Sequence, residues 1–543
     1  MVFARRSTTL LAAIIASCAM VLSLTACTSD NKTVVDGQTT VTSNSAGGVA
    51  VFTPSDGITL NQQTPLNKWA KLVPDLAKAL ADAGFKKGDI DHTTSDSLAK
   101  QSRAIQDFVV DHLSNNTTDD SGIAIAPDNM TLLVAPVVEA DASTRQYGDY
   151  VSQNLSTNDA TDGEATSDGE SSEDDSSKDD SSNTESDSTA SDEQAQAVDR
   201  LVSSLKLAKE SGMHVVLLGN SIEGYKPDAF VKFSDAQTIG KLQAEKMVSK
   251  LKLDKASKDN PKYIEVLLPY TAMDEKGNAN DSTFAQEAFR GIWQVLGSYY
   301  QKGVVESPSG TLDGKSTEND WQAVAYDAAK EGSTAKVLDK RLAKTDGQST
   351  LTRIDGIITM NDYIASEVVK ELDDLGYTGS AADINPQITI SGIVGNITGK
   401  KDLSRDAVPD PIKSPENDNA NDSSSSDDDA DKDTSASDKD RDSQWPLVTG
   451  YGAYVSNIPS IVNGKQWMTG MEDRQTIATD IAQACAKLNK DEALNSMPSI
   501  RNSEVGGVKK IPTINEPLLA VSASNLKSAL IDPGYISLAD AGL

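Results

Sequence analysis

Cysteine and histidine are nearly absent from this chain of 543 residues, which contains three of each. Cys18 and Cys27 lie near the N-terminus, so the rest of the chain has only Cys485 and cannot form an internal disulfide. No histidine has a partner at the spacing typical of metal ligands, and no Gly-x-Ser-x-Gly motif is present. The sequence therefore predicts a fold stabilised by its core, with no enzyme activity, no metal and no cofactor.

Positive charge is also scarce, since 50 lysines and arginines face 81 aspartates and glutamates and the formal net charge is -31. Most of the excess lies in two Ser/Asp-rich stretches, 156–193 and 414–443, which have few large apolar residues. Such stretches bury too little apolar surface to offset the entropy of ordering, so we expect disordered insertions. An acidic surface repels phosphate, and a nucleic-acid partner is not expected.

The N-terminus carries a targeting pattern. Arg5 and Arg6 precede an apolar run over 10–22, and residues 24–27 read Leu-Thr-Ala-Cys. This is a secretory signal, and its apolar run is shorter than the roughly 20 residues that a membrane span needs. The Leu-Thr-Ala-Cys ending is similar to a lipobox, which implies lipid attachment at Cys27. We expect the mature protein to be anchored at the extracytoplasmic face of the cell membrane, with 28–46 as a flexible spacer.

Strand and helix patterns alternate through the rest of the chain. Short apolar runs are typical of buried parallel strands, and helical periodicity separates them. Two successive sets of this kind predict an α/β protein with two lobes of similar construction. The expected strands are 49–53, 131–137, 214–218, 263–268 and 356–360, and the expected helices are 66–84, 97–112, 197–211, 237–251, 283–300, 321–342 and 363–375.

Three groups of residues then resemble a known family in their order along the chain. The first is Gly-Met-His-Val-Val-Leu-Leu-Gly-Asn-Ser at 212–221, with 230–235 and 240–245. The second is Asp-Gly-Ile-Ile-Thr-Met-Asn-Asp at 355–362, and the third is Leu-Val-Thr-Gly-Tyr-Gly-Ala-Tyr at 447–454 with 464–469. The chain resembles the type I solute-binding proteins of bacterial sugar ABC transporters, most nearly the xylose/ribose-binding group.

The resemblance implies two Rossmann-like lobes with parallel sheets, joined by a hinge of several crossovers. Lobe 1 is expected to comprise 47–232 plus 472–512, and lobe 2 to comprise 233–471 plus 513–543. The late strand is predicted at 447–450 rather than at the β-like run 387–394, because the return crossover follows it directly. The implied partners are a small sugar-like ligand held between closing lobes and a membrane permease, with the protein itself a monomer.

Candidate ligand contacts follow from the same frame, because ligands of open α/β sheets bind beyond the carboxyl ends of strands. Planar side chains suit sugar ring faces, and polar ones suit hydroxyl groups. For the two tryptophans the alternative is core packing, and for the residues that precede helices it is capping, with Asp362 as cap and Asn361 as ligand contact. The candidates are Asp56, Trp69, Asn220, Asn280, Asp281, Trp321, Asn361, Asp362, Tyr451 and Glu472.

Three positions depart from the family pattern. An acidic sugar ligand is missing after the late strand, where Tyr451 begins Tyr-Gly-Ala-Tyr, and Glu472 and Asn220 stand where basic residues are common. The resemblance therefore implies the fold more firmly than the ligand. Two other functions stay open: a sensory or scaffold lipoprotein that partners a signalling protein, and a structural surface protein whose acidic stretches are solvated loops.

Overall fold

The computed structural model describes residues 46–55, 65–115, 125–138, 145–150, 153–156, 185–273, 280–328, 330–343, 351–382 and 445–543. The predicted signal with Cys27, Asp56, the run 387–394 and most of both acidic stretches lie outside these ranges. Within them, no helix combines the length and apolar character that crossing a membrane requires.

Seven strands form the first sheet, in the order β15-β16-β7-β5-β3-β1-β2. All neighbours pair in parallel except the hairpin of β15 and β16. The strands are β1 (Gly48–Pro54), β2 (Ile90–Ser95), β3 (Met130–Val134), β5 (His214–Leu218), β7 (Ala229–Lys232), β15 (Ile500–Val505) and β16 (Val508–Asn515).

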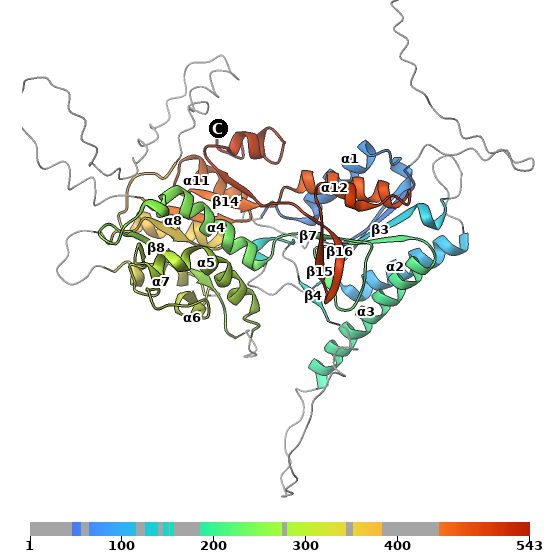
Figure 1. Cartoon of the computed structure of the whole chain (residues 1–543), viewed down its shortest axis with the longest axis horizontal. Helices are drawn as coiled ribbons and strands as arrows, with labels where there is room; N and C mark the ends of the chain where they lie inside the picture. Colours follow the sequence, from blue (N-terminus) through green and yellow to red (C-terminus); the bar gives the residue numbers. More distant parts are fainter. Residues whose placement is uncertain are drawn as a thin grey trace, which may run out of the picture. The chain divides into compact units, whose positions relative to one another are not determined.

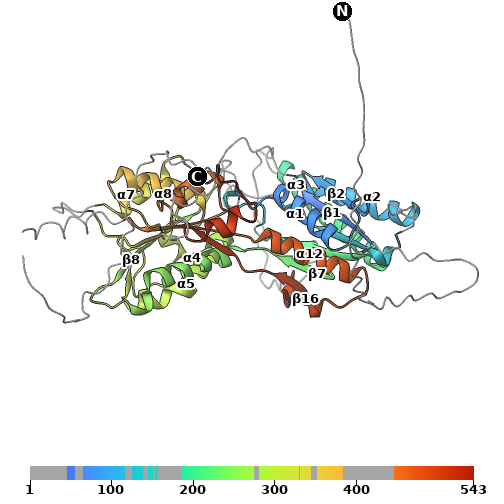
Figure 2. The ribbon, with the colours of Figure 1, turned by 90° about the horizontal axis from the view of Figure 1, so that it is seen from above.

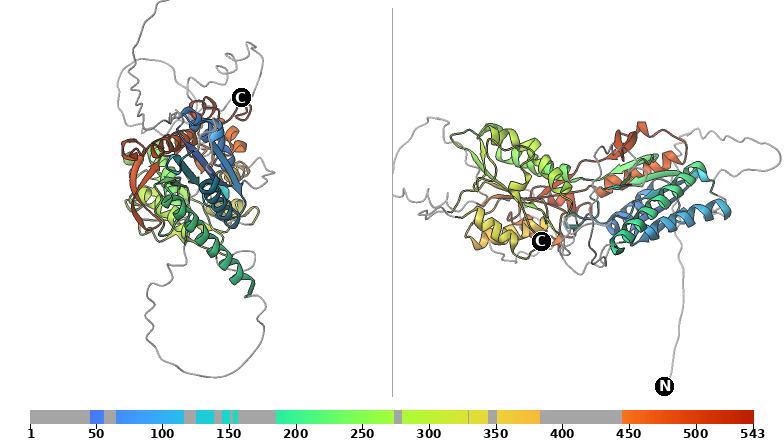
Figure 3. Two further views of the ribbon diagram at one scale, coloured as in Figure 1. Left: turned by 90° about the vertical axis from the view of Figure 1, so that its right-hand side faces the viewer. Right: turned by 90° about the horizontal axis from the view of Figure 1, so that it is seen from below.

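Helices cover both faces of this sheet, as the alternation of buried side chains along a parallel strand requires. Val49 and Val51 of β1 pack with α1 (Trp69–Asp82) and α12 (Arg474–Leu488), whose core also buries Cys485. The alternate β1 side chains pack with α2 (Leu98–Asn115) and α3 (Glu185–Glu210). The α2 and α3 helices run side by side (Figures 1 and 3).

Six strands form the second sheet, in the order β10-β8-β12-β13-β14-β17. Its pairings are parallel except that of β14 with β17. The strands are β8 (Lys262–Val266), β10 (Val305–Glu306), β12 (Gly356–Ile358), β13 (Leu447–Tyr451), β14 (Met468–Met471) and β17 (Leu519–Ser522).

The second sheet is also covered on both faces. Ile358 packs with α4 (Ala236–Leu251) and α5 (Thr283–Gln301). Ile357, the neighbouring residue of β12, packs with α7 (Ser333–Arg341) and α8 (Asp362–Asp374) on the other face (Figure 2). Further elements among the described residues include β4 (Asn154–Leu155), β6 (Ser221–Ile222), β9 (Leu268–Pro269), β11 (Ala325–Tyr326), α6 (Trp321–Val324), α11 (Ile458–Val462) and the one-turn helix Arg145–Tyr147.

The chain passes between the two sheets three times. Residues 233–235 lead from β7 of the first sheet to α4 on the second. Residues 472–473 lead back from β14 to α12, and 516–518 join β16 to β17. We call these segments the three crossovers. Two doubly wound α/β halves connected in this way match the fold class expected from the sequence.

Several local predictions differ from the structure. The single helix predicted over 321–342 is wrong, because α6 ends at Val324 and β11 pairs with β9 before α7 begins. Tertiary pairing overrides the helical periodicity there. The helix α3 begins at Glu185, so the end of the predicted disordered stretch is helical, and 185–193 contains no proline or glycine to stop helix propagation. The late strand at 447–450 is confirmed as part of β13.

The boundary predicted between lobe 1 and lobe 2 at 512/513 also differs from the strand pairing in the structure. The strand β16 continues to Asn515 and pairs there with β7, so the first sheet retains three residues that the prediction assigned to lobe 2. The strand pairing decides the end of this segment, because Thr513 and Ile514 are buried against the first sheet.

Candidate functional site

One buried carboxylate joins two of the crossovers. Oε1 of Glu472, in the second crossover, accepts a hydrogen bond from the backbone amide of Ser234, in the first, at 2.6 Å. The Ser234 hydroxyl is hydrogen-bonded to the hydroxyl of Tyr451, at the end of β13. Glu472 and Tyr451 are among the residues predicted from sequence, and they come together here.

Burial dominates the electrostatics of this group. Loss of water raises the pKa of Glu472 to about 7, although its hydrogen bonds to Ser234 and Tyr451 act in the opposite direction. Burial, followed by the charge of Glu472, raises the pKa of Tyr451 well above its ordinary value. Glu472 therefore changes protonation near neutral pH at the point where two crossovers meet.

Asn67 adds a buried polar side chain beside Glu472. It precedes α1 and is 1% exposed, and its Oδ1 accepts a hydrogen bond from the Glu472 backbone amide at 3.4 Å. Its Nδ2 is buried and has no hydrogen-bond partner among the described residues. A buried donor without a partner is costly in a folded protein, and a ligand oxygen is one way to satisfy it.

The capping role that the sequence assigned to Asp362 belongs to Asn361. Asn361 is the cap of α8, since its Oδ1 accepts from the backbone amide of Ile364 at 2.9 Å. Its Nδ2 donates to Oε1 of Gln146 at 3.0 Å. Asn361, rather than Asp362, is the cap because its extended backbone places its side chain beside the free amides of the first helical turn.

The carboxylate of Asp362 is instead directed at the connection between β13 and β14 and at β14 itself. Its Oδ1 accepts from Gln466 Nε2 at 2.7 Å, and its Oδ2 accepts from the Tyr454 amide and the Thr469 hydroxyl, both at 2.9 Å. Burial raises its pKa to about 6 against these hydrogen bonds. The side chain thus ties α8 to β13 and β14, which is a structural task.

The two predicted tryptophans lie in the apolar core. Trp69 is 3% exposed, and its ring meets Tyr150 at 5.1 Å and Phe233 at 5.7 Å between centroids, both edge to face. Trp321 meets Tyr270 edge to face at 5.1 Å. These contacts correspond to the packing alternative stated for both residues.

The other predicted polar residues that the structure describes bond to connections of the protein itself. Asn220 bridges the connections beside it, accepting from the Gln153 amide at 3.0 Å and donating to the Pro136 carbonyl at 2.9 Å. Asn280 donates to the Thr271 carbonyl at 2.8 Å. Asp281 accepts from the hydroxyl and amide of Thr283, which lowers its pKa. Asp56 lies outside the described residues.

Sequence reasoning missed Asn67, Ser234 and the segment 146–150. Ser234 does fall in the quoted stretch 230–235, directly after an apolar strand, so its position was available as a signal. Asn67 directly precedes a predicted contact, Trp69. The segment 146–150 carried no signal, because it follows a strand without any periodicity of its own.

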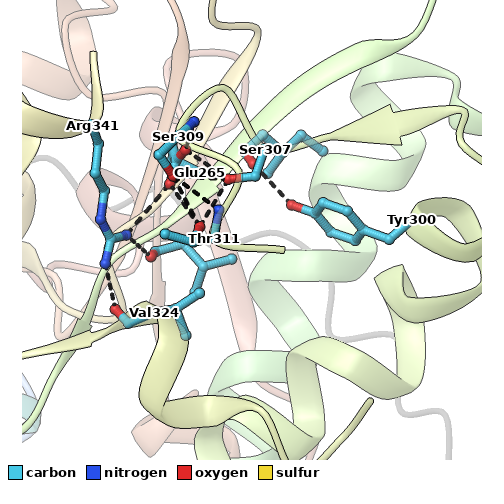
Figure 4. Close-up of polar contacts among 9 residues, drawn as sticks. Glu265, Tyr300, Ser307, Ser309, Thr311, Val324 and Arg341 are labelled. Carbon is cyan, nitrogen blue, oxygen red and sulfur yellow. Dashed lines mark hydrogen bonds and ion pairs between the residues drawn. The ribbon is translucent and has the colours of Figure 1, made fainter. Parts of the chain in front are cut away.

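A second buried polar group lies around Glu265, at the end of β8 (Figure 4). Its Oε1 accepts from the Ser307 hydroxyl at 2.7 Å and the Ser309 amide at 2.8 Å, and Arg341 approaches its Oε2 at 3.4 Å. Arg341 also donates to the Val324 carbonyl at 2.9 Å. The group satisfies its own donors and acceptors, so it stabilises the edge of the second sheet rather than offering a binding site.

Comparison with known proteins gives matches among solved structures alone. No protein-family model and no curated protein matches the chain. A glucose-bound ABC transporter solute-binding protein from Clostridium phytofermentans is 17% identical, with 91% of this chain and 99% of that chain covered and a TM-score of 0.44.

Two further solved structures match with similar identity and TM-score. A carbohydrate transporter solute-binding protein from Chloroflexus aurantiacus, in complex with D-glucose, is 18% identical over 91% of this chain and 98% of its own, with a TM-score of 0.42. A periplasmic ribose ABC transporter protein from Conexibacter woesei is 13% identical over 90% and 96%, with a TM-score of 0.43. Similarity of this size assigns no ligand to this chain, and its fold is described by the strand order above.

Proposed function

We propose that this chain is a lipid-anchored extracytoplasmic solute-binding protein. It captures a sugar or a similar polar small molecule between its two α/β halves and delivers it to the permease of an ABC importer. The anchor is the lipid on Cys27, and the protein acts by binding rather than by catalysis.

The observation that carries this proposal is the meeting of polar groups from both sheets at the crossovers. Asn67 comes from the connection after β1, Tyr451 from the end of β13, and Ser234 and Glu472 from the crossovers themselves. These are carboxyl-end connections, where open α/β sheets bind their ligands. The donor Nδ2 of Asn67 has no partner within the described parts of the chain, which supports its use on a ligand hydroxyl.

The crossovers supply the mechanism of capture. Short connections between two separately packed halves allow hinge closure, which would bring both halves onto one ligand and exclude water from it. Part of the binding free energy is then used to shift the open–closed equilibrium, so moderate affinity is expected.

The test is isothermal titration of the full chain in detergent with D-glucose, D-ribose and D-xylose. Asn67→Ala should lower the affinity for whichever sugar binds by at least tenfold, since one buried donor is lost. The matched control is Ser307→Ala, which removes a buried hydroxyl from the Glu265 group. Binding of another solute class and none of the sugars would overturn the sugar assignment. Equal loss in both variants would show that Asn67 acts only through stability.

The permease requires a separate experiment. Membranes that contain the permease encoded by a neighbouring gene should retain the sugar-loaded protein more strongly than the sugar-free protein. If a membrane kinase is encoded there instead and is retained in the same way, the sensory alternative replaces transport.

A further inference from the structure

The segment 146–150 belongs to the connection between β3 and α3 and makes contacts with both halves of the protein. Tyr147 is 1% exposed and packs in the core of the second sheet, with its ring centroid 4.7 Å from that of Phe284 and 6.3 Å from that of Tyr451. Tyr150 is also 1% exposed but packs in the core of the first sheet, stacked on Phe233 at 4.8 Å.

Polar contacts hold the segment to the second half. The Gln146 carbonyl accepts from the hydroxyl of Tyr454 at 2.6 Å, and the Gln146 side-chain oxygen accepts from Asn361 Nδ2 at 3.0 Å. Tyr454 and Asn361 follow β13 and β12 respectively. Both donors are of the kind that recognise a hydroxyl-bearing ligand, and both are used on the protein's own chain.

Equivalent contacts hold the segment to the first half. The Asp149 amide donates to the Asn67 carbonyl at 2.8 Å, and the Tyr150 hydroxyl donates to the Lys68 carbonyl. Gly148 has a φ of +97°, and a Cβ at this position would lie 2.6 Å from the Asn67 carbonyl oxygen. Glycine is required there by backbone conformation and by the close approach.

The topology places these contacts at the reversal point of each sheet. In the first sheet β1 lies between β2 and β3, and in the second β8 lies between β10 and β12. Connections leave such a point in opposite directions, and ligands of open α/β sheets bind there. Asn67 follows β1, while Asn361 follows β12.

We propose that residues 146–150 are a built-in occupant of the ligand site, which a small molecule has to displace before the two halves can close on it. This inference rests on the proposed function, because it takes the site between the halves as the ligand site. Release of Gln146 frees the side-chain donors of Asn361 and Tyr454 for the ligand. Displacement is a conformational equilibrium, so the apparent association constant equals the intrinsic one multiplied by the fraction of molecules in which the segment is released.

Two substitutions at neighbouring positions of the segment, each removing contacts with a different half, test this. Tyr147→Ala removes its packing on the second half, and Gly148→Ala forces it away from Asn67. Each should tighten binding of D-glucose, D-ribose or D-xylose by up to about tenfold in titration calorimetry, if the segment is seated in about nine molecules of ten. The control Gly224→Ala has the same kind of left-handed φ, +71°, but no neighbour within 4 Å, and should leave affinity unchanged.

Hydrogen exchange supplies a readout that does not depend on which variant folds. In the wild-type protein without sugar, the Asp149 amide should exchange at least tenfold more slowly than in an unstructured peptide, and sugar should speed its exchange. Fast exchange without sugar overturns the inference whatever the titrations give. Equal affinity in wild type and both variants overturns it while the proposed function stands. Absence of sugar binding in all of them overturns the proposed function and this inference with it.

Discussion

The carboxylate of Asp149 accepts a hydrogen bond from the backbone amide of Trp69 at 3.1 Å, although the two residues are 80 positions apart. Trp69 is the first residue of α1, and Lys68 before it provides no side-chain cap. The same carboxylate pairs with Lys68 Nζ at 2.7 Å. A residue from another connection therefore satisfies an amide that a helix N-terminus leaves free.

Asp149→Ala should lower the free energy of unfolding by about 1–2 kcal/mol, because α1 loses this cap. Asp149→Asn keeps an acceptor oxygen and should lose less. The control is Asp82→Ala, since Asp82 pairs with Lys78 at 2.8 Å on the exposed face of the same helix and such pairs contribute little. Urea unfolding measures all three, and similar losses for Asp149→Ala and Asp82→Ala would exclude a capping role.

Glu472 should make stability depend on pH in a specific window. Its pKa is raised from 4.5 to about 7 by burial, so between these values the folded state holds a proton that the unfolded state has released. Its contribution to stability is therefore complete below about pH 4.5 and is lost as the pH rises to about 7.

Glu472→Gln removes this titration. At pH 8 the variant should be more stable than the wild type by up to about 3 kcal/mol, and the gap should close towards pH 5. Asp362, whose pKa is raised to about 6, titrates in both proteins and cancels from the difference. Guanidinium unfolding at both pH values measures the gap. A difference that is the same at pH 5 and pH 8 would rule out Glu472 as the titrating group.

Gly450 in β13 should not tolerate a side chain. A Cβ there would lie 2.2 Å from Oδ1 of Asp362 and 2.7 Å from Nε2 of Gln466, so it would break the hydrogen bond between them. Gly450→Ala should lower the free energy of unfolding by about 2 kcal/mol or more. Gly314→Ala is the control, because its nearest neighbour would be 3.6 Å away. Equal urea midpoints for the two variants would contradict the close packing around Asp362.

Cys27 should determine where the protein resides. Cys27→Ser removes the thiol that the predicted lipidation requires, so the protein should pass from the membrane fraction to the soluble fraction and lose labelling by a radioactive fatty acid. Binding of sugars should be unchanged, since Cys27 precedes the residues of both halves in the sequence. Continued fatty-acid labelling of the variant would disprove lipidation at this residue.

The sequence determined the α/β class and the late strand at 447–450, because buried parallel strands need continuous apolar runs and these can be read directly. It also indicated Tyr451 and Glu472, which follow such runs. Only the tertiary structure decided that β11 replaces the middle of a predicted helix, that Asn361 rather than Asp362 caps α8, and that 146–150 lies between Asn67 and Asn361. Strand runs are local properties of the chain, whereas a cap, a short strand pair or an inserted segment depends on partners brought close by folding, and no periodicity records them.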